Sequence, residues 1–165
     1  MAATRPKLTL ERTFRAPIHE VWELWTTREG IEAWWGPDGF SVDVRSLELR
    51  AGGELVYVMS AVAPEQIDYM KKAGMPVSTH HSLTFTEVIP PRLLAYRSKV
   101  DFVPGVEVYE VETLLELHEV EGGGTRLVLN FEAMHDDSWT QLAKLGHESE
   151  LERLEKLLAE RNRGL

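Results

Sequence analysis

The amino-acid sequence predicts an α+β fold in which a curved antiparallel sheet of six to seven strands wraps around one long C-terminal helix. Three observations lead to this prediction. Short segments of alternating apolar and polar residues recur along the chain and are separated by Gly and Pro turn signals. Two short segments with tryptophans at helical spacing follow the first of these strands. Residues 136–161 lack proline and are rich in Leu, Glu, Lys and Arg, which favours one long terminal helix.

The N-terminal part of the chain predicts one strand followed by two helices. Residues 7–15 alternate as in a strand, and Pro17 stands where the first turn of a helix tolerates a missing N–H. The first helix is expected to run from Pro17 to near Gly30, and the second over residues 31–35, before a turn at residues 36–39. Four of the five tryptophans lie in these two helices. We interpret them as residues of the core, with a flat ligand between aromatic faces as the alternative.

The middle of the chain predicts six further strands. They are expected at residues 40–49, 54–61, 81–88, 93–102, 106–120 and 125–134. Glycine and proline pairs or triplets separate most of them, and these glycines serve turn dihedrals because they lie between strands rather than before a helix. One longer segment, Pro64–Pro76, begins like a helix and ends with glycine and proline, so it predicts an inserted helical loop.

The terminal helix is expected to be capped by Asp136 or Asp137. At about 100° per residue, one arc of this helix gathers most of its apolar residues and is assigned to the interior. The arc holds Trp139, Leu142, Ala143, Gly146, His147, Glu150, Leu154 and Leu157. Two of these residues, His147 and Glu150, are ionisable. The alternative is a helix rotated so that both lie at its edge.

Composition limits the function classes. The 165 residues suit one domain over residues 1–165, with a core from about 8 to 160, and no segment has the ~20 apolar residues of a membrane span. The net charge of −9 disfavours nucleic acid and anionic membranes as partners. The absence of Cys excludes thiolate metal sites and cysteine nucleophiles. His80 and His81 are adjacent on a predicted strand and would point to opposite faces, so no metal site is predicted. We expect a cytoplasmic protein with no cofactor and no membrane insertion.

Five motifs occur in a fixed order along the chain. They are Arg15-Ala16-Pro17 with Val21-Trp22, Trp34-Trp35-Gly36-Pro37, Arg50-Ala51-Gly52-Gly53, Pro90-Pro91-Arg92-Leu93 and Gly124-Thr125-Arg126-Leu127. Over roughly residues 8 to 160, this order resembles the Hsp-90 ATPase activator homologue-like family of the START-like (SRPBCC, helix-grip) superfamily. The resemblance implies a curved sheet that grips the C-terminal helix around an apolar ligand cavity. The family usually has Gly-Trp on the final helix, where this chain has Gly146-His147.

The resemblance, together with the alternation of the strands, predicts which residues line such a cavity. The candidate ligand-binding residues are Tyr57, Met59, Phe85, Tyr96, Tyr109, Leu129, Phe131, Trp139, Leu142, Gly146, His147 and Glu150. On an ordinary sheet the same face would be core, and this alternative stays open. The segment Pro64–Pro76 is longer than the turn usual in the family. It predicts a mobile lid with Ile67, Met70 and Met75 over the cavity rim, or else a permanently packed loop.

Three functional hypotheses follow. The leading one is a binding protein that encloses a small apolar or aromatic ligand between the sheet and the terminal helix. The second is a metal-free cyclase, dehydratase, lyase or hydrolase in which His147 and Glu150, three residues apart, exchange protons with the ligand. No nucleophile or metal pattern supports this second hypothesis. The third is a chaperone cofactor, as the family name suggests. Against it, we expect no second domain in this chain that would bridge a partner. The sequence leaves open a monomer or a homodimer.

Overall fold

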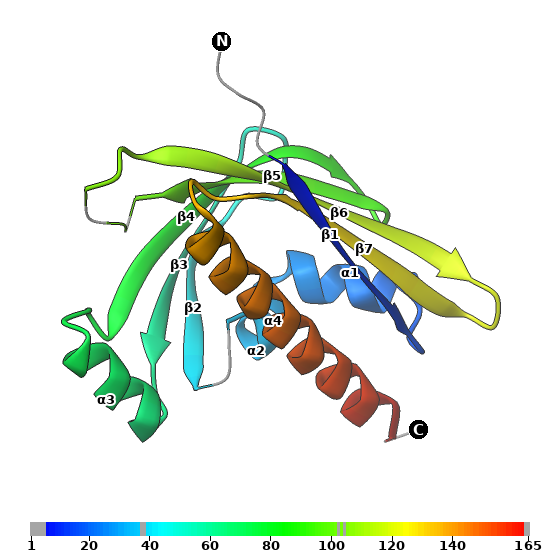
Figure 1. Cartoon of the computed structure of the whole chain (residues 1–165). Coiled ribbons are helices and arrows are strands. Elements are labelled where there is room, and N and C mark those ends of the chain that lie inside the picture. The colour runs from blue at the N-terminus through cyan, green and yellow to red at the C-terminus, as the bar shows by residue number, and fades with distance from the viewer. Residues whose placement is uncertain (1–5, 37–38, 102, 104, 164–165) are drawn as a thin grey trace, which may run out of the picture.

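The computed structural model describes residues 6–36, 39–101, 103 and 105–163. Within them the chain forms one seven-stranded sheet and four helices (Figure 1). The strands are β1 (Lys7–Phe14), β2 (Phe40–Leu47), β3 (Glu54–Ala61), β4 (Ser78–Ile89), β5 (Leu93–Val100), β6 (Tyr109–Val120) and β7 (Gly124–Glu132). The helices are α1 (Ile18–Thr26), α2 (Arg28–Trp34), α3 (Pro64–Lys72) and α4 (Asp137–Arg163).

The sheet is antiparallel throughout, in the order β1-β7-β6-β5-β4-β3-β2. The first strand pairs with the last, so β1 lies beside the strand that leads into α4. The register shifts between Val44 and Ser46 of β2 and between Phe85 and Glu87 of β4. Such bulges bend a strand and increase its twist. They contribute to the curved shape of the sheet, which holds α1, α2 and α4 on its concave side (Figure 1).

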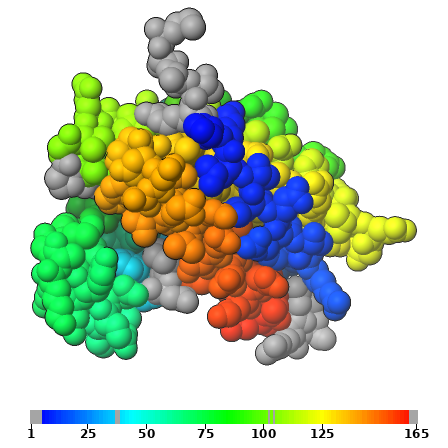
Figure 2. Space-filling model, in the orientation of Figure 1, coloured from blue at the N-terminus to red at the C-terminus, as the bar shows by residue number. Residues whose placement is uncertain are grey.

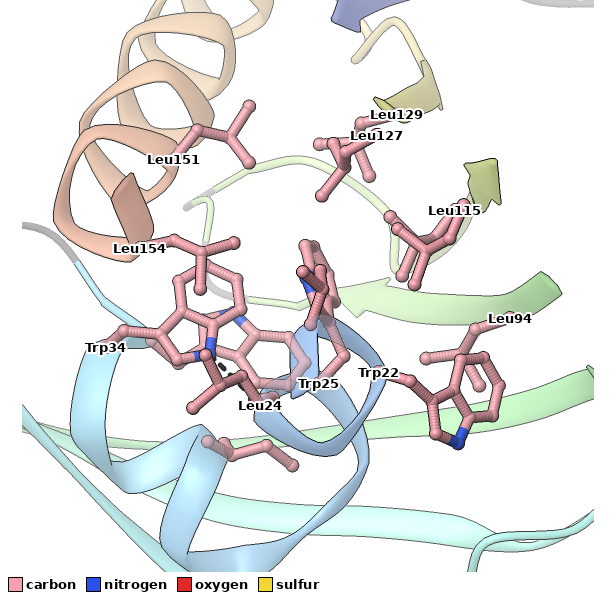
Figure 3. Packing of buried hydrophobic residues seen from close by; sticks show 14 of the residues in the cluster. Trp22, Leu24, Trp25, Trp34, Leu94, Leu115, Leu127, Leu129, Leu151 and Leu154 are labelled. Carbon is pink, nitrogen blue, oxygen red and sulfur yellow. Dashed lines mark hydrogen bonds between the residues drawn. The ribbon is translucent and has the colours of Figure 1, made fainter. Parts of the chain in front are cut away.

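The core fills the space between the helices and the concave face of the sheet. Figure 3 shows Leu154 of α4 beside Trp34, and Leu151 facing the leucines of β7. The indole N–H of Trp34 donates a hydrogen bond to the Leu24 carbonyl at 2.7 Å, which ties α2 to α1. Trp22, Trp25, Trp34 and Trp35 are all buried, so their interpretation as core residues is confirmed.

The predicted fold class is confirmed, and each predicted strand and helix is present. Some boundaries differ by three or four residues: α1 ends at Thr26 rather than near Gly30, and β4 begins at Ser78 rather than at residue 81. Its first residues pair with the end of β3, with Ser78 opposite Ser60. Residues 78–82 are polar and show no apolar alternation, so only this pairing reveals that they belong to a strand.

The interior face of α4 differs from the predicted arc. Leu142 was expected to face inward, but it is 58% exposed, and this prediction was wrong. Leu154 is buried, so its predicted inward position is confirmed, and Thr140, Leu151 and Leu158 are buried as well. Because Leu residues lie on nearly every side of α4, their spacing did not define the rotation of the helix. The observed rotation keeps His147 and Glu150 on the inner side.

Candidate functional site

A cavity of about 190 Å³ lies between the middle strands of the sheet and the N-terminal half of α4. Strands β3 to β6 supply most of its wall, and α4 supplies His147 and Glu150. The lining residues are Trp35, Tyr57, His81, Leu83, Tyr96, Ser98, Lys99, Val100, Val111, Thr113, Met134, His147 and Glu150. The cavity wall therefore combines apolar and aromatic side chains with a similar share of polar groups.

A column of stacked rings extends from the core to this cavity. Trp34 stacks on Trp35 with ring centroids 6.1 Å apart, and Trp35 stacks on Tyr57 at 5.7 Å. Tyr57 in turn stacks on His81 at 5.2 Å. Tyr96 approaches the same column, with its ring centroid 6.4 Å from that of Trp35. Because each ring restricts the next, this wall of the cavity is rigid.

The phenol side chains of Tyr57 and Tyr96 line the cavity. Burial, with the negative charge of Glu150 as the second cause, raises the pKa of Tyr57 far above its ordinary value. Burial also raises the pKa of Tyr96, and Glu150 and Tyr57 add to the shift, while a hydrogen bond with the Thr113 side chain partly opposes it. Both phenols thus keep their protons at neutral pH. Each can donate one hydrogen bond and accept others.

His147 and Glu150 lie one helical turn apart on α4. The Nδ1 of His147 is 3.8 Å from the Oε2 of Glu150, and their side chains are 27% and 14% exposed. The imidazole ring also packs on Phe131, with centroids 4.5 Å apart. At 3.8 Å the pair is an electrostatic contact and not a hydrogen bond.

His81 brings a third ionisable group to the cavity. The Thr79 hydroxyl lies 2.7 Å from its Nε2. Burial lowers the pKa of His81, and the neighbouring His80 adds to this effect, while Asp101 opposes it. The neutral ring, which is the form that this shift favours, carries one donor and one acceptor nitrogen.

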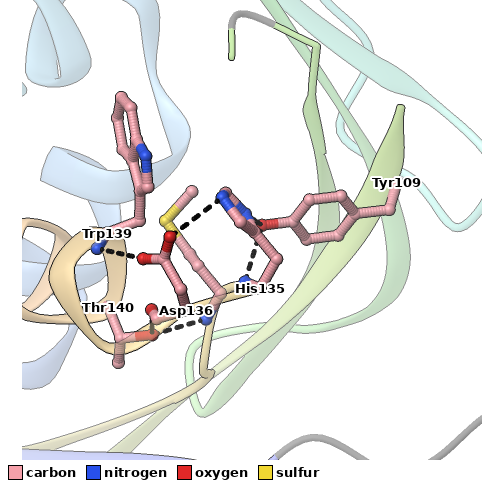
Figure 4. Close-up of polar contacts among 6 residues, drawn as sticks. Tyr109, His135, Asp136, Trp139 and Thr140 are labelled. Atoms are coloured by element: carbon pink, nitrogen blue, oxygen red, sulfur yellow. Dashed lines mark hydrogen bonds and ion pairs between the residues drawn. The ribbon is translucent and has the colours of Figure 1, made fainter. Parts of the chain in front are cut away.

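The junction between β7 and α4 positions the last wall of the cavity. The backbone N–H of Trp139 donates to Asp136 Oδ1 at 2.8 Å, so the predicted cap at Asp136 is confirmed (Figure 4). The Thr140 hydroxyl accepts a hydrogen bond from the backbone N–H of Met134 at 2.9 Å and donates to the Asp136 carbonyl at 2.7 Å. These bonds hold Met134 beside the cavity that it lines.

Comparison with known proteins places the chain in a family. The family model described as "Activator of Hsp90 ATPase homolog 1-like protein" matches residues 15–159. The chain belongs to this family. The resemblance drawn from its five motifs is thus confirmed. No curated protein matches the chain.

Solved structures show the same fold for this family member. The AHSA1 protein of Silicibacter pomeroyi is 21% identical, with 94% of this chain and 99% of the other covered and a TM-score of 0.73. A protein from Chromobacterium violaceum is 20% identical, with 92% and 96% covered and a TM-score of 0.73. A protein from Staphylococcus epidermidis is 25% identical, with 97% and 93% covered and a TM-score of 0.71.

The structure of this family member gathers only part of the predicted ligand-binding set around the cavity. Tyr57, Tyr96, His147 and Glu150 line it. Phe85, Leu129 and Phe131 are instead buried in the core, and Met59 packs against that core. The alternation of the strands placed these residues on the inner face correctly, but apolar neighbours cover them.

Four other predicted residues do not line this cavity. Tyr109 binds His135 through its hydroxyl, with 2.6 Å to Nδ1, and lies at the α4 junction with Trp139. Leu142 is exposed, as described above. A Cβ added at Gly146 would meet no atom within 4 Å, so this glycine does not pack against a cavity wall. They lie outside this lining because Tyr109 begins β6 at the junction with α4 and because α4 is rotated from the predicted orientation; their contact with a ligand stays a prediction.

The sequence prediction missed several lining residues. They are Trp35, His81, Leu83, Ser98, Lys99, Val100, Val111, Thr113 and Met134. The alternation that selected Phe85 also places Leu83 and His81 on the inner face, so this signal was present in the sequence. His80 is exposed and His81 faces the cavity, which confirms that they point to opposite sides. Among the described residues, no group of three or more acidic and His side chains could hold a metal ion.

The inserted segment forms α3, as predicted, but α3 supplies none of the described residues that line the cavity. Met70 is buried, Ile67 is half-buried and Met75 is 41% exposed. Figure 2 shows α3 as a green lobe at the side of the molecule. In this structure α3 therefore lies outside the lining of the cavity, and both its position over a cavity rim and its motion stay predictions. None of the described helices combines the length and apolar character that membrane crossing requires.

Proposed function

We propose that this protein binds a small, largely apolar or aromatic molecule in the cavity between β3–β6 and α4. The observation that carries the proposal is a cavity with a wall of stacked aromatic rings and with convergent polar groups, Tyr57, Tyr96 and Glu150 among them. This combination is typical of small-molecule sites. Membership in a family whose fold often binds ligands supports the same conclusion.

The size of the cavity limits the ligand. An apolar cavity of about 150 Å³ accommodates benzene, and this cavity measures about 190 Å³. We therefore expect a molecule with one ring or a short branched chain and one polar group. A steroid or a lipid with long acyl chains would need a larger space.

A cavity-filling variant tests this function. Val111 lines the cavity, so Val111→Phe should reduce the free volume and weaken binding of small aromatic probes at least about tenfold. Val108→Phe is the matched control, because Val108 is 59% exposed and lies outside the lining. Binding is measured by the chemical shifts of the Trp35 indole N–H in NMR titrations, with circular dichroism as a check of folding. Equal binding by a folded Val111→Phe variant and the wild type would refute the proposal.

An enzymatic function is a second candidate, favoured by the position of His147 beside Glu150 on the cavity wall. Two proton-exchanging groups in one apolar pocket suit a metal-free lyase or cyclase. Ligands found by the titrations above would be incubated with the protein and analysed by mass spectrometry. Conversion that persists at the same rate in His147→Ala and Glu150→Gln would remove this candidate.

A further inference from the structure

Glu150 is a carboxylate whose hydrogen-bonding capacity is unused. Its side chain is only 14% exposed. Among the described residues, no N–H or O–H group donates a hydrogen bond to it, and its one ion-pair contact is His147 Nδ1 at 3.8 Å. An ionised carboxylate offers about four acceptor positions, and leaving them unfilled in a partly buried site costs free energy. These acceptor positions are therefore open to water or to the donor groups of a ligand.

The nearby phenols and His81 leave the negative charge of Glu150 uncompensated. The two nearby phenols, Tyr57 and Tyr96, stay neutral because burial and Glu150 itself raise their pKa. The pKa of His81 is lowered by burial, so its neutral form is favoured. Lys99 also borders the cavity, but it is exposed and forms no ion pair with Glu150. His147 is thus the nearest cationic candidate, and it stands beyond hydrogen-bond distance.

We infer that the cavity selects small organic cations, namely primary or secondary ammonium compounds with one ring or a short apolar chain, and that Glu150 binds their N–H groups. This inference rests on the proposed function and adds the charge class of its ligand. The ammonium group would donate charge-assisted hydrogen bonds to Glu150, which are roughly twice as strong as neutral ones. The phenol oxygens of Tyr57 and Tyr96 can accept its remaining N–H groups. The apolar part would lie against Leu83, Val100 and Val111.

Three probes of similar shape and different charge test the inference. Benzylamine, benzyl alcohol and benzoate share one ring and carry a cation, a neutral group and an anion. We expect benzylamine to bind about tenfold more tightly than benzyl alcohol in NMR titrations near neutral pH, because a hydrogen bond to a charged group exceeds a neutral one by about a factor of ten in binding. Benzoate should bind most weakly, because Glu150 repels it.

Two variants separate the effect of the Glu150 carboxylate on cation binding from the effect of the net charge of the protein. The net charge of −9 attracts any cation, so the loss of one negative charge anywhere on the protein weakens cation binding slightly. Glu150→Gln should remove the preference for benzylamine over benzyl alcohol. Glu152→Gln is the matched control, since Glu152 is exposed on the same helix and makes the same change in charge. It should keep the preference.

The outcomes distinguish this inference from the proposed function. If benzyl alcohol and benzylamine bind equally well to the wild type, or benzoate binds best, the inference is overturned while the binding function stands. If none of the three probes binds at millimolar concentration, both are overturned. Equal loss of the preference in the Glu150 and Glu152 variants would assign the preference to net charge and overturn the role of Glu150. The wild-type comparison decides the charge class even if the Glu150 variant does not fold.

Discussion

The hydroxyl of Tyr109 holds both the main chain and the side chain of His135. It accepts a hydrogen bond from the His135 backbone N–H at 3.0 Å and lies 2.6 Å from the ring Nδ1 (Figure 4). Tyr109 begins β6, and His135 immediately precedes the Asp136 cap of α4. One hydroxyl group therefore connects the sheet to the start of the helix that closes the cavity.

Removing this hydroxyl should loosen the junction. Tyr109→Phe keeps the ring but removes both hydrogen bonds to His135, which are exposed to water, so we expect the free energy of unfolding to fall by about 0.5–1.5 kcal/mol. Urea denaturation measures this change. Tyr69→Phe is the control, because Tyr69 is 65% exposed on α3. Removal of the Tyr69 hydroxyl should change the free energy of unfolding by less than about 0.5 kcal/mol. Equal effects in the two variants would mean that the junction contributes nothing to stability.

The rotation of α4 predicts opposite outcomes for two leucines on the same helix. Leu154 is fully buried against the core, so Leu154→Ala should lower the free energy of unfolding by about 2–5 kcal/mol. Leu142 is 58% exposed, so Leu142→Ala should change it by less than about 0.5 kcal/mol. Thermal and urea denaturation of both variants give the comparison. A larger loss at Leu142 would indicate the originally expected rotation.

Two glycines should respond in opposite directions to alanine. A Cβ at Gly53 would collide with the Glu48 carbonyl oxygen, so Gly53→Ala forces the turn between β2 and β3 apart. Gly146 lies within α4, and a Cβ there meets no atom within 4 Å. Gly146→Ala should therefore stabilise the protein by about 0.5–1 kcal/mol, because glycine is unfavourable inside a helix. The melting temperature should rise for Gly146→Ala and fall for Gly53→Ala; a fall in both would contradict this account of α4.

The buried imidazole of His81 predicts a loss of stability in acid. Burial lowers its pKa below the ordinary value of 6.5, so the folded protein binds this proton less readily than the unfolded chain. The contribution of His81 to the free energy of unfolding is then complete above pH 6.5. It is lost as the pH falls from this value through the pKa of His81 in the folded protein.

Melting temperatures at a series of pH values measure this effect. His81→Gln should reduce the dependence on pH in the window below 6.5. His19→Gln is the control, since His19 is exposed on α1, and it should retain the wild-type slope. An unchanged slope in a folded His81→Gln variant would assign the acid sensitivity to other groups.

The sequence could predict lining residues that lie on strands, but not those that lie in the connections. Tyr57 and Tyr96 lie on regular strands, where a period of two assigns each side chain to a face, and both line the cavity as expected. Trp35 lies after a helix, and Met134 lies between a strand and a helix, where no period applies. Trp35 is placed by stacking on Tyr57 of β3, and Met134 by its hydrogen bond to Thr140 at the start of α4.

The sequence by itself determined the order of strands and helices, the turns between them and the family, because alternation, glycine and proline act over a few residues. Only the tertiary structure decided which side of α4 faces inward. Rotating an isolated helix about its axis changes none of its internal hydrogen bonds, so local energies do not select one orientation. Packing of Leu151, Leu154 and Leu158 into the core selects it, and this rotation places His147 and Glu150 at the cavity.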